Sequence, residues 1–315
     1  MKASQLTAFG KAADVLRVQD VSVPRPGRGE MLIEMLAAVV NPADLNIIEG
    51  KYGELPPLPA VIGNEGVGRV VELGASVSGF AVGDLVLPIR SGTWAQYMVA
   101  DAAEAIRLPE KIDIHQAAML SVNPPSAWAM LEDFVSLNPG DWIVQNAANS
   151  AVGRCVIQIA KARGLKTLNV VRRPELLDEL RAVGGDVVVL EDTDLRAQVT
   201  ELCGGDRPRL ALNAVGGASA LNLANAVADL GVVVTYGAMG RQPLKIPNGL
   251  LIFRNLSFQG FWLKRWRANA SREKAEKTLG TLAGLSLSGR LHMPIHRVFA
   301  LDDLAAAVEE AGAGA

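Results

Sequence analysis

The stretch of residues 141–160, DWIVQNAANSAVGRCVIQIA, has the residue types of a phosphate-binding turn between a strand and a helix. Residues 142–144 form a short apolar run, and apolar residues recur at helical spacing over 151–160. The exposed N–H groups at a helix N-terminus can bind the diphosphate of a dinucleotide. Of the usual three glycines, however, only Gly153 is present. Taken alone, the pattern also fits the strand-turn-helix of any α/β domain.

Ala148 and Ser150 stand where the other two glycines would be. We expect the turn of Asn149, Ser150, Ala151 and Val152 to hold phosphate with backbone N–H groups and side-chain donors, with Asn149 in a left-handed backbone conformation. These residues are therefore candidate cofactor-binding residues.

A basic pair follows the next predicted strand, TLNVV at residues 167–171. An NAD-binding domain usually places Asp or Glu at this strand end, where the carboxylate accepts a hydrogen bond from the ribose 2′-hydroxyl. Here Arg172 and Arg173 follow instead, and guanidinium groups suit a 2′-phosphate. The pair predicts NADPH as the cofactor. The alternative is a solvated basic pair in front of a helix that begins at Pro174.

Composition narrows the class of protein. The chain has 315 residues, enough for two domains or one large one. Of these residues, 50% are hydrophobic and 20% are charged, as in a globular protein. A net charge of −2 argues against a nucleic-acid partner, and no apolar run is long enough to span a membrane. The first residues have no apolar or Arg-rich leader, so the prediction is a cytoplasmic protein.

The cysteines and histidines do not predict a metal site. Cys155 and Cys203 are too few for a disulfide framework. His292 and His296 are four residues apart, but Pro294 between them interrupts any helix that could direct both at one ion.

The order of the predicted elements indicates two kinds of domain. Residues 1–115 alternate apolar and polar residues between Pro and Gly turns, as β-rich material does. Over 116–262 short Val/Ile/Leu runs alternate with helices, which predicts a doubly wound parallel sheet, the Rossmann fold. Residues 263–315 return to the first domain. Because no strand follows the helical pattern of 301–310, we expect a C-terminus that is truncated or disordered.

This layout resembles the medium-chain dehydrogenase/reductase superfamily, in which a Rossmann domain is inserted into a GroES-like catalytic domain. The block GNEGVGRVVELG at 63–74 is similar to the G-H-E-x-x-G block of the zinc alcohol dehydrogenases. Asn64 and Asn41, however, stand where a zinc-binding His and Cys would be. The resemblance therefore implies a zinc-independent branch with no metal.

Within that branch the chain resembles the trans-2-enoyl-thioester reductases of mitochondrial-type fatty acid synthesis. The similar segments are VNPADLNIIEGKYGELPPLPAVIGNEG, SVNPPSAWAMLEDF, QNAANSAVG with NVVRR, and TYGAM with GFWLKRW. The implied function is NADPH-dependent reduction of the 2,3 double bond of an enoyl thioester of CoA or acyl carrier protein. Two alternatives stay open. One is a quinone or enone oxidoreductase, whose relatives share NPAD but keep a G-A-x-G-G-V-G turn, and the other is a non-catalytic NADPH-binding protein.

The resemblance also implies roles for further residues. Tyr52 matches the proton-donating tyrosine, and a phenol stays protonated at neutral pH; the alternative is a tyrosine packed in a Gly-rich loop. Asn123 matches a cofactor-contacting Asn. The residues expected to line the nicotinamide are Tyr236, Gly237, Ala238 and Met239 after a strand end, with Phe261, Trp262 and Leu263 closing the pocket. The alternative for the last three is a plain hydrophobic strand.

Two further expectations concern assembly and the chain end. The strands at 232–236 and 256–262 suit edge pairing in a homodimer, as in dimers of the superfamily. A lysine in the family's final strand reaches the cofactor phosphate, and the sequence stops at Ala315 before such a strand. We therefore expect weakened cofactor binding.

Overall fold

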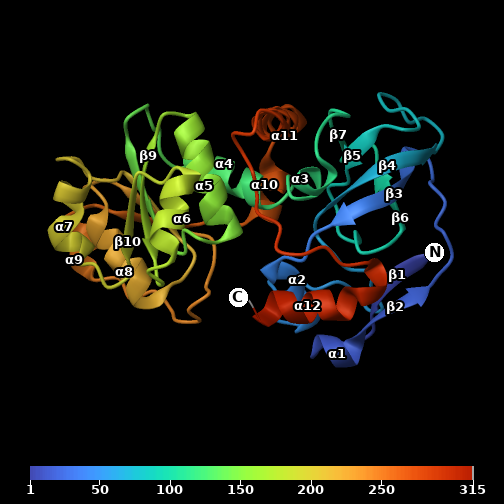
Figure 1. Cartoon of the computed structure of the whole chain (residues 1–315), viewed down its shortest axis with the longest axis horizontal. Helices are drawn as coiled ribbons and strands as arrows, with labels where there is room; N and C mark the ends of the chain where they lie inside the picture. The colour runs from blue at the N-terminus through green and yellow to red at the C-terminus, as the bar shows by residue number, and fades with distance from the viewer. Residues whose placement is uncertain (314–315) are drawn as a thin grey trace. The chain divides into compact units, whose positions relative to one another are not determined.

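The computed structural model describes residues 1–313 and divides them into two compact units. The first unit contains 1–122, 279–287 and 294 onward, and the second contains 123–278 and 288–293. Gly314 and Ala315, and with them the chain end on which the truncation expectation rests, lie outside the described residues. Each unit is described by itself (Figure 1).

The first unit is built on antiparallel sheets. A five-stranded sheet has the order β6-β3-β4-β5-β7, and β1 and β2 form a separate two-stranded sheet. The strands are β1 (Lys2–Leu6), β2 (Leu16–Asp20), β3 (Glu30–Ala38), β4 (Gly66–Leu73), β5 (Leu85–Leu87), β6 (Tyr97–Asp101) and β7 (Ile106–Arg107). Burial alternates along β6, as the sequence pattern predicts for a strand with one face in a core, whereas all three residues of β5 are buried.

Short helices cover the first unit. They are α1 (Ala12–Val15), α2 (Pro42–Ile48), α3 (Ile114–Ala118), the 3-10 turn η1 (Leu301–Asp303) and α12 (Leu304–Ala313), with part of α11 (Arg272–Leu287). Helix α12 packs against α1, α2 and β2. Ile47 and Ile48 of α2 share a buried apolar cluster with Leu304 and Val308 of α12. The first and last parts of the chain therefore build one core.

The second unit contains a six-stranded, all-parallel sheet with the order β10-β9-β8-β11-β12-β13. This is the strand order of a dinucleotide-binding fold, with β8 as the first strand and the reversal of order between β8 and β11. The strands are β8 (Trp142–Gln145), β9 (Lys166–Val171), β10 (Val187–Leu190), β11 (Leu210–Asn213), β12 (Val232–Thr235) and β13 (Ser257–Gly260). The predicted doubly wound sheet is confirmed.

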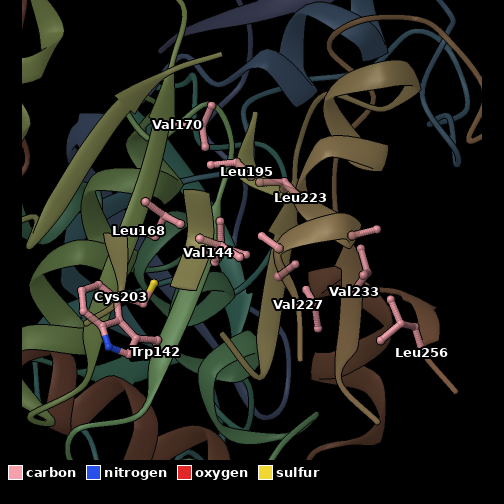
Figure 2. Close-up of a cluster of buried hydrophobic side chains, with 14 of the residues drawn as sticks. Trp142, Val144, Leu168, Val170, Leu195, Cys203, Leu223, Val227, Val233 and Leu256 are labelled. Atoms are coloured by element: carbon pink, nitrogen blue, oxygen red, sulfur yellow. The ribbon is translucent and has the colours of Figure 1, made fainter. Parts of the chain in front are cut away.

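Helices cover both faces of this sheet. The helices of this unit include α4 (Asn123–Glu132), α5 (Ala151–Ala162), α6 (Leu176–Val183), α7 (Leu195–Leu202), α8 (Gly217–Ala226), α9 (Asn248–Ile252) and α10 (Leu263–Asn269). On one face Val144, Leu168 and Val170 pack against α7, α8 and α9. Figure 2 shows these three side chains with Leu195 of α7 and Leu223 of α8. On the other, Val171 packs against α5 and α6. Residues 170 and 171 face opposite sides because successive side chains of a strand do so.

Within residues 1–313, no helix combines the length and the apolar character that crossing a membrane requires.

Candidate active site

The turn between β8 and α5 has the form of a phosphate-binding turn. Ser150 is the N-cap of α5, and its Oγ accepts a hydrogen bond from the Gly153 N–H at 3.1 Å. The first N–H groups of a helix have no acceptor within the helix, so those of Ala151 and Val152 can bind an anion. The left-handed residue of the turn is Ala147, with φ of 46°, and not Asn149 as predicted.

Asn149 takes part in the turn through its backbone. Its carbonyl oxygen accepts a hydrogen bond from Arg154 Nε at 3.0 Å, which holds the turn to the first part of α5. The Ser150 N–H donates to the Ala147 carbonyl oxygen at 2.9 Å, so Ala148 and Asn149 are the central residues of a closed turn. The left-handed residue, Ala147, opens this turn.

Gly153 is retained for a steric reason. A Cβ atom at this position would lie 2.6 Å from the Ala148 carbonyl oxygen and 2.7 Å from its Cα. Both atoms belong to the backbone and cannot rotate away. The glycine therefore allows α5 to pack closely on the turn, which is the role of the last glycine in a dinucleotide-binding motif.

The Tyr236 hydroxyl is a buried hydrogen-bond donor near the same turn. Tyr236 follows the carboxyl end of β12, and its hydroxyl lies next to the Ser150 side chain but makes no hydrogen bond of normal geometry within residues 1–313. Burial raises the pKa of this phenol, so it stays protonated. A buried donor without a partner costs about 1–3 kcal/mol, and a phosphate oxygen at the α5 N-terminus would satisfy it. The residues present therefore fit a dinucleotide.

Two buried asparagines that the sequence analysis missed hold the carboxyl edge of the sheet together. Asn146 Nδ2 donates to Asn213 Oδ1 at 2.9 Å, and Asn146 Oδ1 accepts from the Ala214 N–H at 2.7 Å. Asn213 Nδ2 donates to Thr235 Oγ1 at 3.1 Å. The network joins the ends of β8, β11 and β12. The signal in the sequence that could have predicted this network is an Asn at the carboxyl end of each of two buried strands, Asn146 after β8 and Asn213 in β11.

This edge also fixes the segment predicted to line the nicotinamide. The Tyr236 N–H donates to the Asn213 carbonyl oxygen at 3.0 Å, and the Met239 N–H donates to the Ala214 carbonyl oxygen at 2.9 Å. Gly237 lies against the Ala214 backbone, where a Cβ atom would approach the carbonyl oxygen to 2.9 Å. Ala238 and Met239 are exposed. The segment is thus anchored on one side and open on the other.

Arg172 and Arg173 follow the carboxyl end of β9, and both are exposed. Arg173 Nε lies 3.5 Å from Glu175 Oε1, in an ion pair that is itself largely exposed and therefore weak. The helix after the pair begins at Leu176 rather than at Pro174, with Glu175 as its N-cap. The guanidinium groups precede the helix and remain available to a ligand.

The other predicted cofactor residues lie at helix starts. Asn123 is the first residue of α4. Strand β13 ends at Gly260, two residues earlier than predicted, so Phe261, Trp262 and Leu263 leave the sheet. The Phe261 ring lies edge-on to Phe134 with centroids 6.3 Å apart, Trp262 is the N-cap of α10, and Leu263 begins that helix. The alternative of a plain hydrophobic strand for these three residues is therefore wrong.

Tyr52 lies in the first unit, four residues after the end of α2. Its side chain is half-buried against the apolar cluster that contains Ile47, Ile48 and Trp94. Such packing is compatible with a proton donor and also with the alternative of a structural tyrosine.

A polar cluster occupies the positions compared above with zinc ligands. Asn41 Nδ2 donates to Glu65 Oε2 at 2.9 Å, and Asn64 Nδ2 donates to Asp44 Oδ1 at 2.7 Å. Glu65 Oε1 also accepts from the Ser121 N–H at 2.9 Å. Across residues 1–313, no group of three or more His, Cys, Asp or Glu side chains is placed to hold a metal ion.

Comparison with known proteins connects both units to one family. Residues 27–110 match the alcohol dehydrogenase GroES-like domain, and residues 151–279 match the zinc-binding dehydrogenase family. The chain is 42% identical to the mitochondrial enoyl-(acyl-carrier-protein) reductase of Xenopus tropicalis, over 96% of this chain and 89% of the relative. The chain belongs to the enoyl thioester reductases of the medium-chain dehydrogenase/reductase superfamily. The predicted family and the predicted fold, a Rossmann domain within a GroES-like domain, are confirmed.

Solved structures agree with this enoyl reductase family. The complex of Etr1p with NADP and crotonyl-CoA has a TM-score of 0.90 at 31% identity, covering 99% of this chain and 97% of Etr1p. A putative NADPH:quinone reductase from Bacillus thuringiensis has a TM-score of 0.91 at 30% identity, covering 98% of this chain and 94% of its own. Fold similarity alone therefore does not separate enoyl reductases from quinone reductases.

The prediction of a cytoplasmic location is wrong for this enoyl reductase. The relative from Xenopus tropicalis is mitochondrial, and so are further curated relatives. The prediction rested on the composition of the first residues, which does not report where members of this family work.

Proposed function

We propose that this chain reduces the 2,3 double bond of trans-2-enoyl thioesters with NADPH. The observation that carries the proposal is the unpaired, buried Tyr236 hydroxyl beside the N-terminus of α5. It supports a dinucleotide at the turn of Asn149, Ser150, Ala151 and Val152, in a chain 42% identical to an enoyl-(acyl-carrier-protein) reductase.

The reaction needs a hydride at the β-carbon and a proton at the α-carbon. NADPH supplies the hydride when it is bound. The α5 N-terminus and the Tyr236 hydroxyl would hold the diphosphate, while Asn123 and the segments 237–239 and 261–263 would orient the nicotinamide. Tyr236, expected from the sequence at the nicotinamide, is thus reassigned in this proposal. Tyr52 would donate its hydroxyl proton to the α-carbon as negative charge develops there. The proposal includes no metal, because Asn41 and Asn64 donate hydrogen bonds to carboxylates.

The test is the oxidation of NADPH, followed by its absorbance, with crotonyl-CoA, longer enoyl-CoA thioesters and a panel of quinones. We expect turnover with the enoyl thioesters at a kcat/KM well above that for any quinone. Oxidation of NADPH with quinones alone would favour the quinone reductase alternative, to which the similarity with the Bacillus thuringiensis structure points. NADPH binding without turnover of any acceptor would identify a binding protein.

Cofactor choice gives a separate prediction. Replacing Arg172 and Arg173 together by Ala should weaken NADPH binding by about 10- to 100-fold, because a charge-assisted hydrogen bond to phosphate contributes about 1.5–3 kcal/mol. NADH binding should change little, since NADH has no 2′-phosphate. Dissociation constants from nicotinamide fluorescence would measure both. Arg196→Ala, an exposed arginine of α7, is the matched control. Equal losses for the two cofactors would contradict the assignment.

We also propose that the chain forms a homodimer through β13. Edge pairing by the other predicted strand, 232–236, is wrong, because β12 lies between β11 and β13 inside the sheet. This strand ends the sheet of the second unit, and exposed apolar side chains precede it, among them Phe253 with 84% of its surface accessible. Unpaired strand edges beside apolar surface are typical of sheet-to-sheet association. A monomer by light scattering at micromolar concentration would exclude it.

Two further statements stay predictions. They are the use of acyl carrier protein as the thioester carrier and the domain limits at residues 115/116 and 262/263.

A further inference from the structure

Asp44 lies at the first turn of α2 and is fully buried. Both of its carboxyl oxygens accept hydrogen bonds. Oδ2 accepts from the Asn41 backbone N–H at 2.8 Å, and Oδ1 accepts from Asn64 Nδ2 at 2.7 Å. The first bond is part of a capping box at the N-terminus of α2, in which Asn41 is the N-cap residue and Asp44 is residue N3. The second bond ties the helix to a different part of the chain, the segment in front of β4.

Asn64 is itself fixed in place. Its Oδ1 accepts from Ser91 Oγ at 2.7 Å, which leaves Nδ2 as the atom that faces Asp44. The preceding residue, Gly63, has φ of +104°, and a Cβ atom there would meet Trp94 Cδ1 at 2.4 Å. Only glycine fits this backbone, and it directs Asn64 toward α2. The hydrogen bond from Ser91 and the backbone conformation of Gly63 therefore both orient the Asn64 amide toward the Asp44 carboxyl group.

The other end of α2 carries the proposed proton donor. The helix ends at Ile48, and the chain turns through the bonds Gly50 N–H to Ile47 O at 3.0 Å and Lys51 N–H to Asn46 O at 2.8 Å. Tyr52 follows at once. The helix has only 7 residues, so its position depends on contacts outside itself. Apolar packing of Ile47 and Ile48 supplies one such contact, and the bond between Asp44 and Asn64 supplies a directional one.

We propose that Asp44 and Asn64 are positioning residues for Tyr52, because the hydrogen bond between their side chains fixes α2 and hence the loop that carries the phenol. This inference rests on the proposed function, in which Tyr52 donates the proton. Neither side chain touches the reacting atoms in this proposal. Small displacements of a catalytic group cost rate even when the displaced group is chemically intact, and a shift of about 1 Å can cost about 100-fold.

Asn64→Ala tests the proposal in two backgrounds. In the otherwise unchanged chain, it should lower kcat for crotonyl-CoA by about 10- to 100-fold and leave the NADPH dissociation constant unchanged. In a Tyr52→Phe background, the same change should lower kcat by less than about 2-fold, because no phenol is left to misplace. Equal losses in the two backgrounds would overturn the proposal. Asn46→Ala, an exposed asparagine on the same helix, is the matched control.

Hydrogen exchange gives a readout that does not depend on turnover. Asn64→Ala should speed exchange of the Gly50 and Lys51 amides by about 10-fold or more, with little change in the amides of β4. Unchanged exchange would overturn the proposal even if kcat fell. If Asn64→Ala does not fold, Asn64→Ser serves in its place, since a hydroxyl donor should retain part of the rate. A wild type that turns over no enoyl thioester would refute the proposed function, and exchange alone would then decide whether the bond fixes the loop.

Discussion

Replacing Tyr52 by Phe is expected to lower kcat for enoyl-CoA reduction by about 10²- to 10⁴-fold, the usual contribution of a positioned general acid. The ring remains and can keep its contacts with the apolar cluster around Ile47 and Ile48. The NADPH dissociation constant should not change, because the proposed cofactor contacts belong to residues of the second unit. Steady-state kinetics and fluorescence titration of NADPH would check both statements.

Tyr97→Phe is the control for this variant. Tyr97 is a half-buried tyrosine of β6 in the same unit, and its hydroxyl donates a long hydrogen bond of 3.5 Å to Glu34. Its loss should leave kcat within about 2-fold of the wild type. An unchanged kcat in Tyr52→Phe would remove Tyr52 from its role and favour the alternative of a packed structural tyrosine.

The stability of the first unit is expected to fall as the pH rises toward 7. Burial raises the pKa of Asp44 from its ordinary value of 3.8 to about 7, and the charge of Glu65 acts in the same direction. Hydrogen bonds from Asn41 and Asn64 oppose the shift. Between pH 3.8 and about pH 7, the native state therefore binds more protons at Asp44 than the unfolded state does. The contribution of the Asp44 carboxyl group to the free energy of unfolding is fully present below about pH 4, declines as the pH rises, and is lost above about pH 7.

Comparison with Asp44→Asn isolates this contribution. Relative to the variant, the unfolding free energy of the wild type should be lower at pH 8 than at pH 5 by about 2–3 kcal/mol, at 1.36 kcal/mol for each pH unit of the window. Urea unfolding of both proteins at the two pH values would measure it. Asp14→Asn, an exposed aspartate of α1, should show no such pH-dependent difference. A difference independent of pH would show that Asp44 does not titrate in this range.

The fold could be predicted from local patterns because each element carries its own signal. The apolar runs that became β8 to β12 alternate with helical patterns, and this alternation identifies a parallel sheet even though only Gly153 remains of the glycine motif. The limits of elements were less predictable. The sequence of 256–262 reads as one apolar strand, but the chain leaves the sheet after Gly260 and begins α10.

The polar groups of the site could be predicted only in part. Arg172, Arg173 and Ser150 lie at element ends, where spacing along the chain is informative. The bond between Asp44 and Asn64 and the network of Asn146 with Asn213 join residues 20 and 67 positions apart. No local pattern reports such partners. The left-handed backbone at Ala147 was also missed, because intrinsic preference favoured Asn149.

Helix α12 has a consequence for how the first unit is made during synthesis. Leu304 and Val308 complete the apolar cluster to which α2 contributes Ile47 and Ile48. Most of the chain separates these two pairs of residues. During synthesis Ile47 and Ile48 therefore leave the ribosome first, and they stay uncovered until the second unit and then α12 have followed. Domains that lack a late segment present apolar surface to their surroundings and are prone to misassembly. Nascent chains that end before Leu304 should therefore be favoured clients of molecular chaperones, although their parallel sheet is complete.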